Sequence, residues 1–461
     1  MSIRTILIWI IIAGILGAGV LVTRAQQQAS RDAQPASSTR TIGFDPVSIS
    51  AIERLVDDQR EILEQDPTRL EQWSVHWAQG GMDHRWAVQS NKAKGALRML
   101  STARIQTLEE DQLNTIGGEL LLRQTDGSSI RIEFDSTSSG GFNIIRIEHR
   151  DTQGVATARW FGRIQRRVYD ALISTNLRQW RSNQLFELPN SSIRSVELEA
   201  GGLSLVLART SSGWIIQEPF AIHGDTQAIE NLIKVLGSLQ ANGFVDDPVD
   251  QSTTGLGSPI AKIRLASESR NPSLTIGTRA DVGGSSVYGQ VETEMGSALV
   301  TLKTDQLAKL TAAAEPYIAR TPSSETLGSV VGIQINGRDA RLRFQAKREL
   351  GKWTIGESQA DSVNRDAIDR LIGLLLHEPA TVVNVIDADS AIEPVGSVAL
   401  IGADGRSLDE LGFAIDSTPS GMRLLLIHQL DDGRQVVWGT VSDDAAATGA
   451  WLTAVAGKRV P

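Results

Sequence analysis

The stretch IRSVELEAGGLSLVLAR, residues 193–209, alternates apolar and polar side chains on either side of Gly201-Gly202. This alternation is typical of two half-buried strands joined by a tight turn, so we predict a β-hairpin. The segment WIIQEP at 214–219 follows, and Asp225 then stands where it can cap a helix. The apolar residues of that helix recur at helical spacing along one face: Ile229, Leu232, Ile233, Leu236 and Leu239.

Four more strands are predicted after this helix from short runs of alternating or β-branched residues, at 260–266, 273–277, 286–291 and 298–302. Asp305 is expected to cap a short terminal helix that runs through Leu310. A unit of mainly antiparallel sheet with two helices is an α+β arrangement rather than a doubly wound parallel fold.

The same pattern recurs further along the chain, because Trp353 follows Trp214 at an offset of 139 residues at which other residues also match. In this copy Asn364 is the expected helix cap, and the apolar stripe is Ile368, Leu371, Ile372 and Leu375. We predict three tandem copies, at residues 44–184, 185–326 and 327–461. The first is divergent, and its tryptophan signal is expected at Trp86, in WAVQS.

The N-terminus carries an uncharged apolar run, ILIWIIIAGILGAGVLV, from Ile6 to Val22. A helix of this length reaches across a hydrocarbon core of roughly 30 Å. We therefore predict a membrane anchor at 1–24, in contact with the bilayer from Ile3 to Val22, followed by a flexible linker at 25–43. The alternative is a cleaved signal peptide, since Thr23-Arg24-Ala25 weakly resembles a cleavage site.

The side of the membrane on which the body lies is predicted from two opposing signals. Arg24, Arg31 and Arg40 follow the apolar run and only Arg4 precedes it, which by a count of basic residues would place the body in the cytoplasm. Long domains that follow such a segment are translocated largely regardless of these charges. We expect a single-pass protein of the bacterial cytoplasmic membrane with an extracytoplasmic, periplasmic body.

The composition excludes several classes of function. Lys plus Arg number 45 against 54 Asp plus Glu, a net charge of −9, which disfavours nucleic acid as a partner. The chain has no cysteine, so it has no disulfide, thiolate nucleophile or cysteine-bound metal.

No residue set in the sequence matches a catalytic motif, and we assign no catalytic, cofactor-binding or metal site and no cofactor. Gly140-Gly141 and Gly283-Gly284 are read as turns between strands. The acidic pairs are expected in turns or at helix starts: Asp246-Asp247, Asp387 with Asp389, Asp431-Asp432 and Asp443-Asp444. The six histidines are scattered, with one cluster of His76, Asp83 and His84, and structural roles are expected for all of them: His76, His84, His149, His223, His377 and His428.

Two sets of repeated residues have alternative interpretations. Trp214 and Trp353 could stack on a ligand, but we interpret them as core residues because each recurs together with its helix. The arginines at the ends of the copies, Arg181, Arg320 and Arg459, could bind an anionic partner or could neutralise carbonyl groups at a helix end.

The segment GLGSP at 255–259, the strand IAKIRLA, LTIG at 274–277, VYG at 287–289 and ALVTLKTDQLAKL at 298–310 resemble the domain-of-unknown-function family 4340. The resemblance is best over 185–326 and weaker over 327–461, where Glu393-Pro394-Val395-Gly396 replaces the glycine-leucine motif. It implies a bacterial membrane-anchored protein with its body outside the cytoplasm, associated with ABC-2-type permeases and gliding-motility-type transport components. The family has no catalytic residues that could be carried over.

The copies repeat one pattern, and no cluster of polar residues stands out among them. We therefore expect a non-enzymatic accessory or scaffold protein linked to an ABC-type transport system. Its expected partner is an ABC-type permease or another envelope protein. The alternative is an envelope hydrolase, or a protein that binds a polymer or solute at a site between copies.

Overall fold

The structure is a computed structural model that describes residues 38–457 apart from 70, 80–81, 339–342, 356–357 and 420. The described chain forms two compact units, of which one ends at Ser182 and the other begins at Asn183. The predicted anchor and most of the predicted linker lie outside the described residues. Among those that are described, no helix is both long and apolar enough to cross a bilayer.

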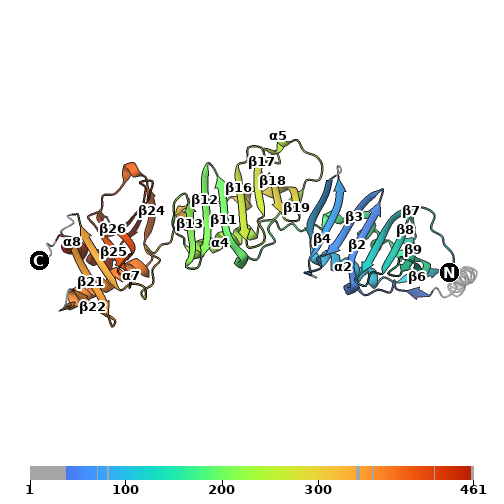
Figure 1. The fold of residues 1–461 in the computed structure, drawn as a ribbon. Helices are drawn as coiled ribbons and strands as arrows, with labels where there is room; N and C mark the ends of the chain where they lie inside the picture. The colour runs from blue at the N-terminus through green and yellow to red at the C-terminus, as the bar shows by residue number, and fades with distance from the viewer. Residues whose placement is uncertain are drawn as a thin grey trace, which may run out of the picture. The chain divides into compact units, whose positions relative to one another are not determined.

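The first unit is built on a ten-stranded antiparallel sheet of order β1-β6-β10-β9-β8-β7-β2-β3-β4-β5 (Figure 1). Its helices are α2 (Ser90–Ser101) and α3 (Arg166–Tyr169). Its strands are β1 (Thr39–Arg40), β2 (Ile49–Val56), β3 (Gln59–Gln65), β4 (Trp73–Gln79), β5 (Met82–Val88), β6 (Ile105–Leu108), β7 (Ile116–Gln124), β8 (Ser129–Ser139), β9 (Phe142–Arg150) and β10 (Ala156–Gln165).

The second unit contains two nine-stranded antiparallel sheets, the second and third of the chain. The second sheet is accompanied by α4 (Thr226–Gly237), α5 (Gln251–Thr254) and α6 (Thr304–Leu307). Its strands are β11 (Ile193–Ala200), β12 (Leu203–Thr210), β13 (Gly213–Glu218), β14 (Ile222–His223), β15 (Gly243–Phe244), β16 (Ala261–Ser267), β17 (Ser273–Arg279), β18 (Ser286–Thr293) and β19 (Gly296–Lys303).

The third sheet is accompanied by two long helices, α7 (Ser362–Leu376) and α8 (Asp443–Ala456), which pack against each other, while α8 contacts β27. Its strands are β20 (Gly332–Gly337), β21 (Arg343–Glu349), β22 (Lys352–Ile355), β23 (Ser358–Gln359), β24 (Val382–Ile386), β25 (Gly396–Ile401), β26 (Ser407–Thr418), β27 (Gly421–Gln429) and β28 (Gln435–Thr440).

One strand order recurs in all three sheets. The second sheet runs β14-β13-β12-β11-β16-β17-β18-β19-β15, and the third runs β23-β22-β21-β20-β25-β26-β27-β28-β24. Read from β5, the first sheet runs β5-β4-β3-β2-β7-β8-β9-β10-β6, with β1 added at its edge. The predicted α+β class and the repeated sheet units are therefore confirmed, and the repetition includes the divergent first copy.

The predicted hairpin and the predicted first helix of the second copy are both confirmed. β11 and β12 form the predicted hairpin, and Gly201 and Gly202 occupy its turn with φ of 59° and 81°, a conformation that glycine adopts without steric cost. The Asp225 carboxylate caps α4 by accepting from the Ala228 N–H at 2.9 Å. The apolar side chains predicted along this helix are buried: Ile229, Leu232, Ile233, Leu236 and Leu239.

Four details differ from the prediction. The cap of α7 is Asp361, which accepts from the Asn364 N–H at 2.8 Å, because this helix begins three residues before the position expected from the offset. Asp305 lies in the first turn of α6 rather than at its cap, and α6 ends at Leu307. Thr39–Arg40, assigned from sequence to the linker, form β1 and pair with β6.

The fourth difference concerns the tryptophan of the first copy. β4 occupies the place of β13 in the common strand order, and it begins at Trp73, which pairs with Gln65 across the hairpin much as Trp214 pairs with Arg209. Trp86 lies in the next strand, β5. Trp73, not Trp86, is therefore the structural counterpart of Trp214.

The connector before each sheet of the second unit bonds to the end of the helix of the same copy or to the segment that follows it. Ahead of the second sheet, the Leu185 N–H donates to the Leu239 carbonyl at 3.1 Å. Ahead of the third sheet, the Ser323 N–H donates to the Leu375 carbonyl at 3.0 Å, and the Ala380 N–H donates to the Arg320 carbonyl at 2.9 Å. These backbone hydrogen bonds make each connector part of the folded copy that follows it in the chain.

Candidate functional site

The histidine cluster suggested by the sequence does not assemble. His76 of β4 pairs with Arg85 of β5, whereas His84 pairs with Trp77. Because adjacent residues of a strand point to opposite faces, His76 and His84 lie on opposite faces of the sheet. His84 stacks on Trp77 with ring centroids 5.2 Å apart. Within the described residues, no three His, Asp or Glu side chains converge as a metal site requires.

Several of the acidic and glycine pairs singled out in the sequence lie in turns or at the start of a helix. Asp443 and Asp444 form the first turn of α8. Asp432 accepts from the guanidinium of Arg434, and this hydrogen bond lowers the pKa of its carboxyl. Asp281 holds the turn that contains Gly283-Gly284: hydrogen bonds from the hydroxyls of Ser286 and Ser285 lower the pKa of Asp281 to about 2.

Trp214 and Trp353 are both core residues, with exposed fractions of 2% and 4%. Their polar atoms have different surroundings. Trp353 Nε1 donates to the Asp369 carboxylate at 2.9 Å. Trp214 Nε1 is buried and meets no hydrogen-bond acceptor among the described residues, while the Arg209 guanidinium lies 5.0 Å from the centre of the Trp214 ring.

The repeated arginines bind backbone carbonyls. Arg320 donates to the carbonyls of Ala380 and Thr381 at 2.7 and 2.9 Å, beyond the end of α7. Arg181 is buried, donates to the Arg178 carbonyl at 2.8 Å and lies 5.1 Å from the Trp77 ring centre. Arg459 is outside the described residues. The Arg178 carbonyl lies in the last helical turn of the first copy, as predicted for Arg181. The carbonyls bound by Arg320 lie outside a helix in the next copy, so the prediction that Arg320 neutralises the end of its own copy's last helix was wrong.

A buried ion network in the first unit was missed by the sequence analysis. Glu61 is 1% exposed, and its carboxylate accepts from Arg54 Nη1 at 3.2 Å, Arg178 Nε at 3.0 Å and the Leu177 N–H at 2.8 Å. Arg54 also donates to the Ile173 carbonyl at 3.1 Å. The network fastens residues 173–178 to β2 and β3. A sequence signal did exist, since both charges lie in otherwise strand-like segments.

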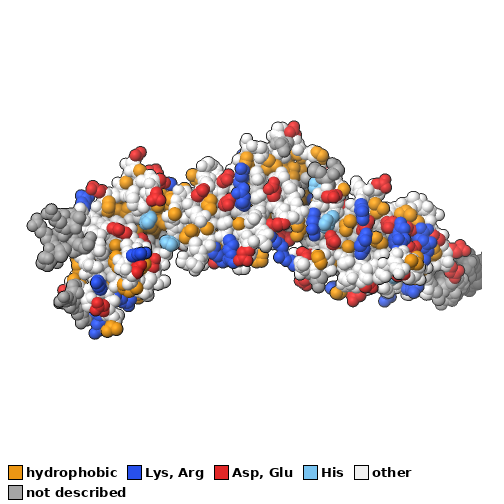
Figure 2. All heavy atoms as spheres, in the orientation of Figure 1, with side chains coloured by type: hydrophobic (Ala, Val, Ile, Leu, Met, Phe, Trp, Pro, Cys, Tyr) orange, Lys and Arg blue, Asp and Glu red, His pale blue; other side chains and the backbone are white. Residues whose placement is uncertain are grey.

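Opposite charges also alternate across the strands of the first sheet, and we call this set the charge ladder. It joins Glu119 to Arg131 and Glu133 to Arg146, both at 2.6 Å, and Glu148 to Arg159 at 2.6 Å. Figure 2 shows basic and acidic side chains interleaved over this unit. Each ladder charge has an oppositely charged partner, so the ladder carries no net charge.

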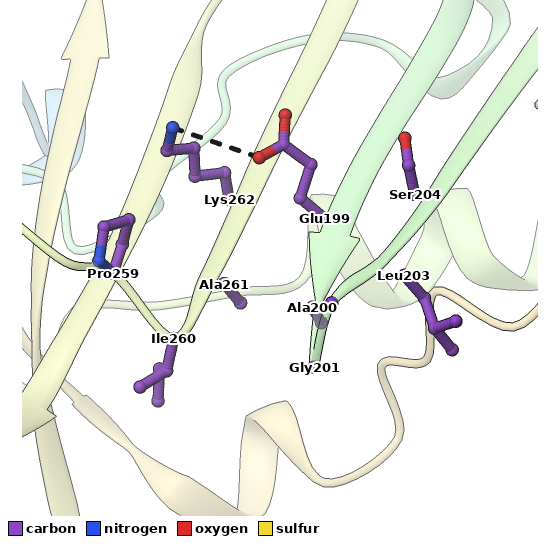
Figure 3. Close-up of a pocket in the computed structure, with 10 residues that line it drawn as sticks. Glu199, Ala200, Gly201, Leu203, Ser204, Pro259, Ile260, Ala261 and Lys262 are labelled. Carbon is purple, nitrogen blue, oxygen red and sulfur yellow. Dashed lines mark ion pairs between the residues drawn. The ribbon is translucent and has the colours of Figure 1, made fainter.

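The second sheet carries an open groove of about 440 Å³ beside the hairpin turn at Gly201-Gly202. In Figure 3, Glu199 and Lys262 face each other at one end, with Lys262 Nζ 3.9 Å from the carboxylate, and Leu203 and Ile260 lie at the other. Leu203 and Ile260 are 54% and 55% exposed, which is high for large apolar side chains.

The third sheet carries a more apolar groove of about 390 Å³ formed by β24, β26, β27 and β28. Its floor is Leu425 and Val437, with Ile386 and Ile392 packed beside them. An ion pair between Arg423 and Asp416 borders it. The floor suits an apolar segment and the rim suits a polar backbone or headgroup, which is the chemistry of a binding surface.

Comparison with solved structures gives only distant likenesses. The DNA polymerase III beta subunit from Thermotoga maritima is 9% identical, with 87% of this chain and 94% of that chain covered and a TM-score of 0.14. A putative DNA polymerase III beta subunit from Eubacterium rectale ATCC 33656 is 7% identical, with 87% and 92% covered and a TM-score of 0.15. At these TM-scores the likenesses carry no argument. No curated protein matches the chain.

Comparison with protein families gives one informative result. The family described as "Domain of unknown function (DUF4340)" matches residues 166–259 and 214–392. These two overlapping matches include the second sheet and the beginning of the third, where the sequence resemblance was found. They support the relationship of this part of the chain to the domain-of-unknown-function family DUF4340.

Proposed function

We propose that the chain is a non-enzymatic, single-pass membrane protein whose repeated body acts outside the cytoplasm as an accessory or scaffold for an ABC-type transport system. The observation that carries the proposal is the recurrence of one strand order in three sheets. Tandem copies of one architecture present extended surfaces to a partner, as repeat proteins do. The apolar run at Ile6–Val22 supplies the anchor, and the resemblance to the family supplies the link to transport.

The surface that we assign to the partner is the groove of the third sheet. Ile386, Ile392, Leu425 and Val437 offer an apolar floor, and this kind of patch marks a contact site on soluble domains. The Arg423–Asp416 pair at the rim can orient an incoming backbone. A short apolar segment of a permease's extramembrane loop has the chemistry that fits.

Site-specific photocrosslinking in native membranes tests this assignment. A photoreactive residue at Asn384, which is exposed and lines the groove, should crosslink a permease or another envelope protein. The matched control is Arg365, exposed on α7 of the same copy, which should give no such product. Failure of both positions to capture any envelope protein would contradict the proposal. A crosslink from Asn384 to an envelope polymer would instead favour a polymer-binding role.

A further inference from the structure

Four arginines lie at one corner of the first sheet, and we call them the arginine corner: Arg40, Arg104, Arg166 and Arg167. Arg40 of β1 pairs with Ile105 of β6, the residue after Arg104. Arg166 and Arg167 begin α3 directly after β10, the other neighbour of β6. All four are exposed. Arg163 pairs with Gln106, so it points to the face of the sheet opposite to Arg40 and is not part of the corner.

The arginine corner differs from the charge ladder of the same sheet in having almost no acidic partners. Among the described residues, Arg40, Arg104 and Arg167 form no ion pair, whereas Arg166 lies 3.5 Å from the Asp170 carboxylate and donates to the Ser138 hydroxyl at 2.6 Å. The corner is therefore a local excess of positive charge. The chain's negative net charge does not oppose it nearby, because residues 38–182 carry equal numbers of basic and acidic side chains.

A small groove of about 220 Å³ runs through the corner. Arg104 and Arg167 line it together with the apolar side chains of Met99, Ile164 and Val168. At the edge beside it, the Arg40 guanidinium lies 5.3 Å from the ring centre of half-buried Trp160. Guanidinium groups next to apolar and aromatic side chains match the boundary between phospholipid headgroups and acyl chains.

The corner also lies where the chain enters the first sheet. β1 starts at Thr39, and sixteen residues separate it from Val22, the end of the predicted anchor. Sixteen residues can span at most roughly 55 Å even when fully extended, so the predicted anchor would keep this corner near the bilayer surface. We propose that the arginine corner binds anionic phospholipid headgroups of the membrane that holds the anchor. The inference rests on the membrane attachment in the proposed function.

Lipid is favoured over the other anionic ligands by two observations. The linker holds the corner at high effective concentration near headgroups, which no free anion shares. A polynucleotide would track an extended basic surface, whereas this one is confined to a corner, and the negative charge of the chain resides in residues 183–461. Both leaflets of a bacterial membrane expose phosphate groups, so the proposal does not depend on the side occupied by the body.

The absence of cysteine allows a single-label test on the full chain. The substitution Gln165→Cys allows a fluorophore to be attached beside the groove. The labelled chain is inserted into nanodiscs of phosphatidylcholine alone or of phosphatidylcholine with phosphatidylglycerol. Both kinds of nanodisc contain a quencher linked to a lipid headgroup. We expect strong quenching only with phosphatidylglycerol. Arg40→Glu/Arg104→Glu/Arg167→Glu should abolish it, since about fivefold per arginine amounts to a loss of roughly a hundredfold in affinity. Added salt should weaken it.

The control applies the same charge change elsewhere: Lys347→Glu/Arg348→Glu/Lys352→Glu in the third copy should leave quenching unchanged. Glutamine versions of the corner variant guard against misfolding, which circular dichroism would reveal. Equal quenching in both nanodiscs, or quenching that survives the corner variant, would overturn the proposal, as would full competition by millimolar inorganic phosphate or by a short oligonucleotide. If the chain does not enter nanodiscs, the anchor fails, and co-sedimentation of the same chain with vesicles of the two compositions tests the corner independently.

Discussion

Trp438 of the third sheet donates a hydrogen bond from Nε1 to the carbonyl of Ala319, at the end of the second copy, over 2.7 Å. The Trp438 side chain is 2% exposed, so the bond is shielded from water. Nearby, Arg434 donates to the Pro219 carbonyl at 3.2 Å, and its guanidinium lies 5.0 Å from the centre of the Phe220 ring. The second and third copies therefore meet through specific polar contacts.

Trp438→Phe should weaken this junction, because phenylalanine keeps much of the apolar ring and removes the donor. A buried hydrogen bond of this kind contributes about 1 kcal/mol, and the unmet Ala319 carbonyl adds to the loss. Hydrogen–deuterium exchange should accelerate in peptides around 315–323 and 435–440. Trp451→Phe is the control, since it removes the bond to Asn364 inside the third copy. Unchanged exchange at 315–323 in the Trp438 variant would contradict the assignment.

The tryptophans at matching positions of the second and third copies should respond differently to one substitution. Trp353→Phe removes the hydrogen bond to the Asp369 carboxylate, and bonds to charged groups contribute about 1.5–3 kcal/mol. Trp214→Phe removes an N–H that has no acceptor among the described residues, so its cost should be smaller. Chemical denaturation of both variants gives the comparison. A larger loss for Trp214→Phe would show that its N–H has a partner in solution.

Glu61→Ala should strongly destabilise the first unit. Removing one partner of a buried ion pair costs about 3–5 kcal/mol, and here Arg54 and Arg178 would both lose their carboxylate. Glu71→Ala breaks only an exposed pair with Lys94 and should cost at most about 1 kcal/mol. Urea unfolding of the two variants distinguishes these values. Equal midpoints would mean that the network does not fasten residues 173–178 to the sheet.

The first unit should lose stability on mild acidification. Burial, together with the charge of Arg85, lowers the pKa of His76, and burial also lowers the pKa of His149. The unfolded chain then takes up protons first, near the ordinary histidine pKa of about 6.5, so the free energy of unfolding falls as pH drops below about 7 and levels off below the folded pKa values. His76→Gln/His149→Gln should flatten unfolding curves measured between pH 7 and pH 5. An unchanged slope in this variant would assign the dependence to other groups.

The second copy could be predicted from sequence because its signals are local. Strand alternation about Gly201-Gly202 and the stripe of α4 depend on residues close in the chain, and both were found as expected. A constant offset of 139 residues does not predict the cap of α7, because this helix starts about one turn earlier than α4 does in its own copy. Trp73 cannot be identified from sequence alone because β4 carries two tryptophans, Trp73 and Trp77, and β5 carries Trp86, and only strand order and register distinguish them.

The surfaces could not be predicted, because they depend on contacts between distant residues. The Glu61 network joins positions more than a hundred residues apart. The arginine corner likewise exists only because β6 lies between β1 and β10, which places Arg40 beside residue 105 and Arg104 near the end of β10. The net charge of the whole chain does not reveal such a corner, because it is a sum over units that carry different charges.

The connectors determine where this protein can be dissected. The third copy uses Arg320 and Ser323 to complete the segment behind α7, so a fragment that starts at the predicted boundary of 327 would be missing its own edge. A fragment that starts near Ala319 would retain those bonds and the carbonyl that accepts from Trp438, and it would lose the contact of Arg434 with Pro219 and Phe220. A fragment that contains one copy should therefore begin before the connector, whether it is made for expression, for exchange between relatives or for crystallisation. Insertions that add further copies should be placed at the same position.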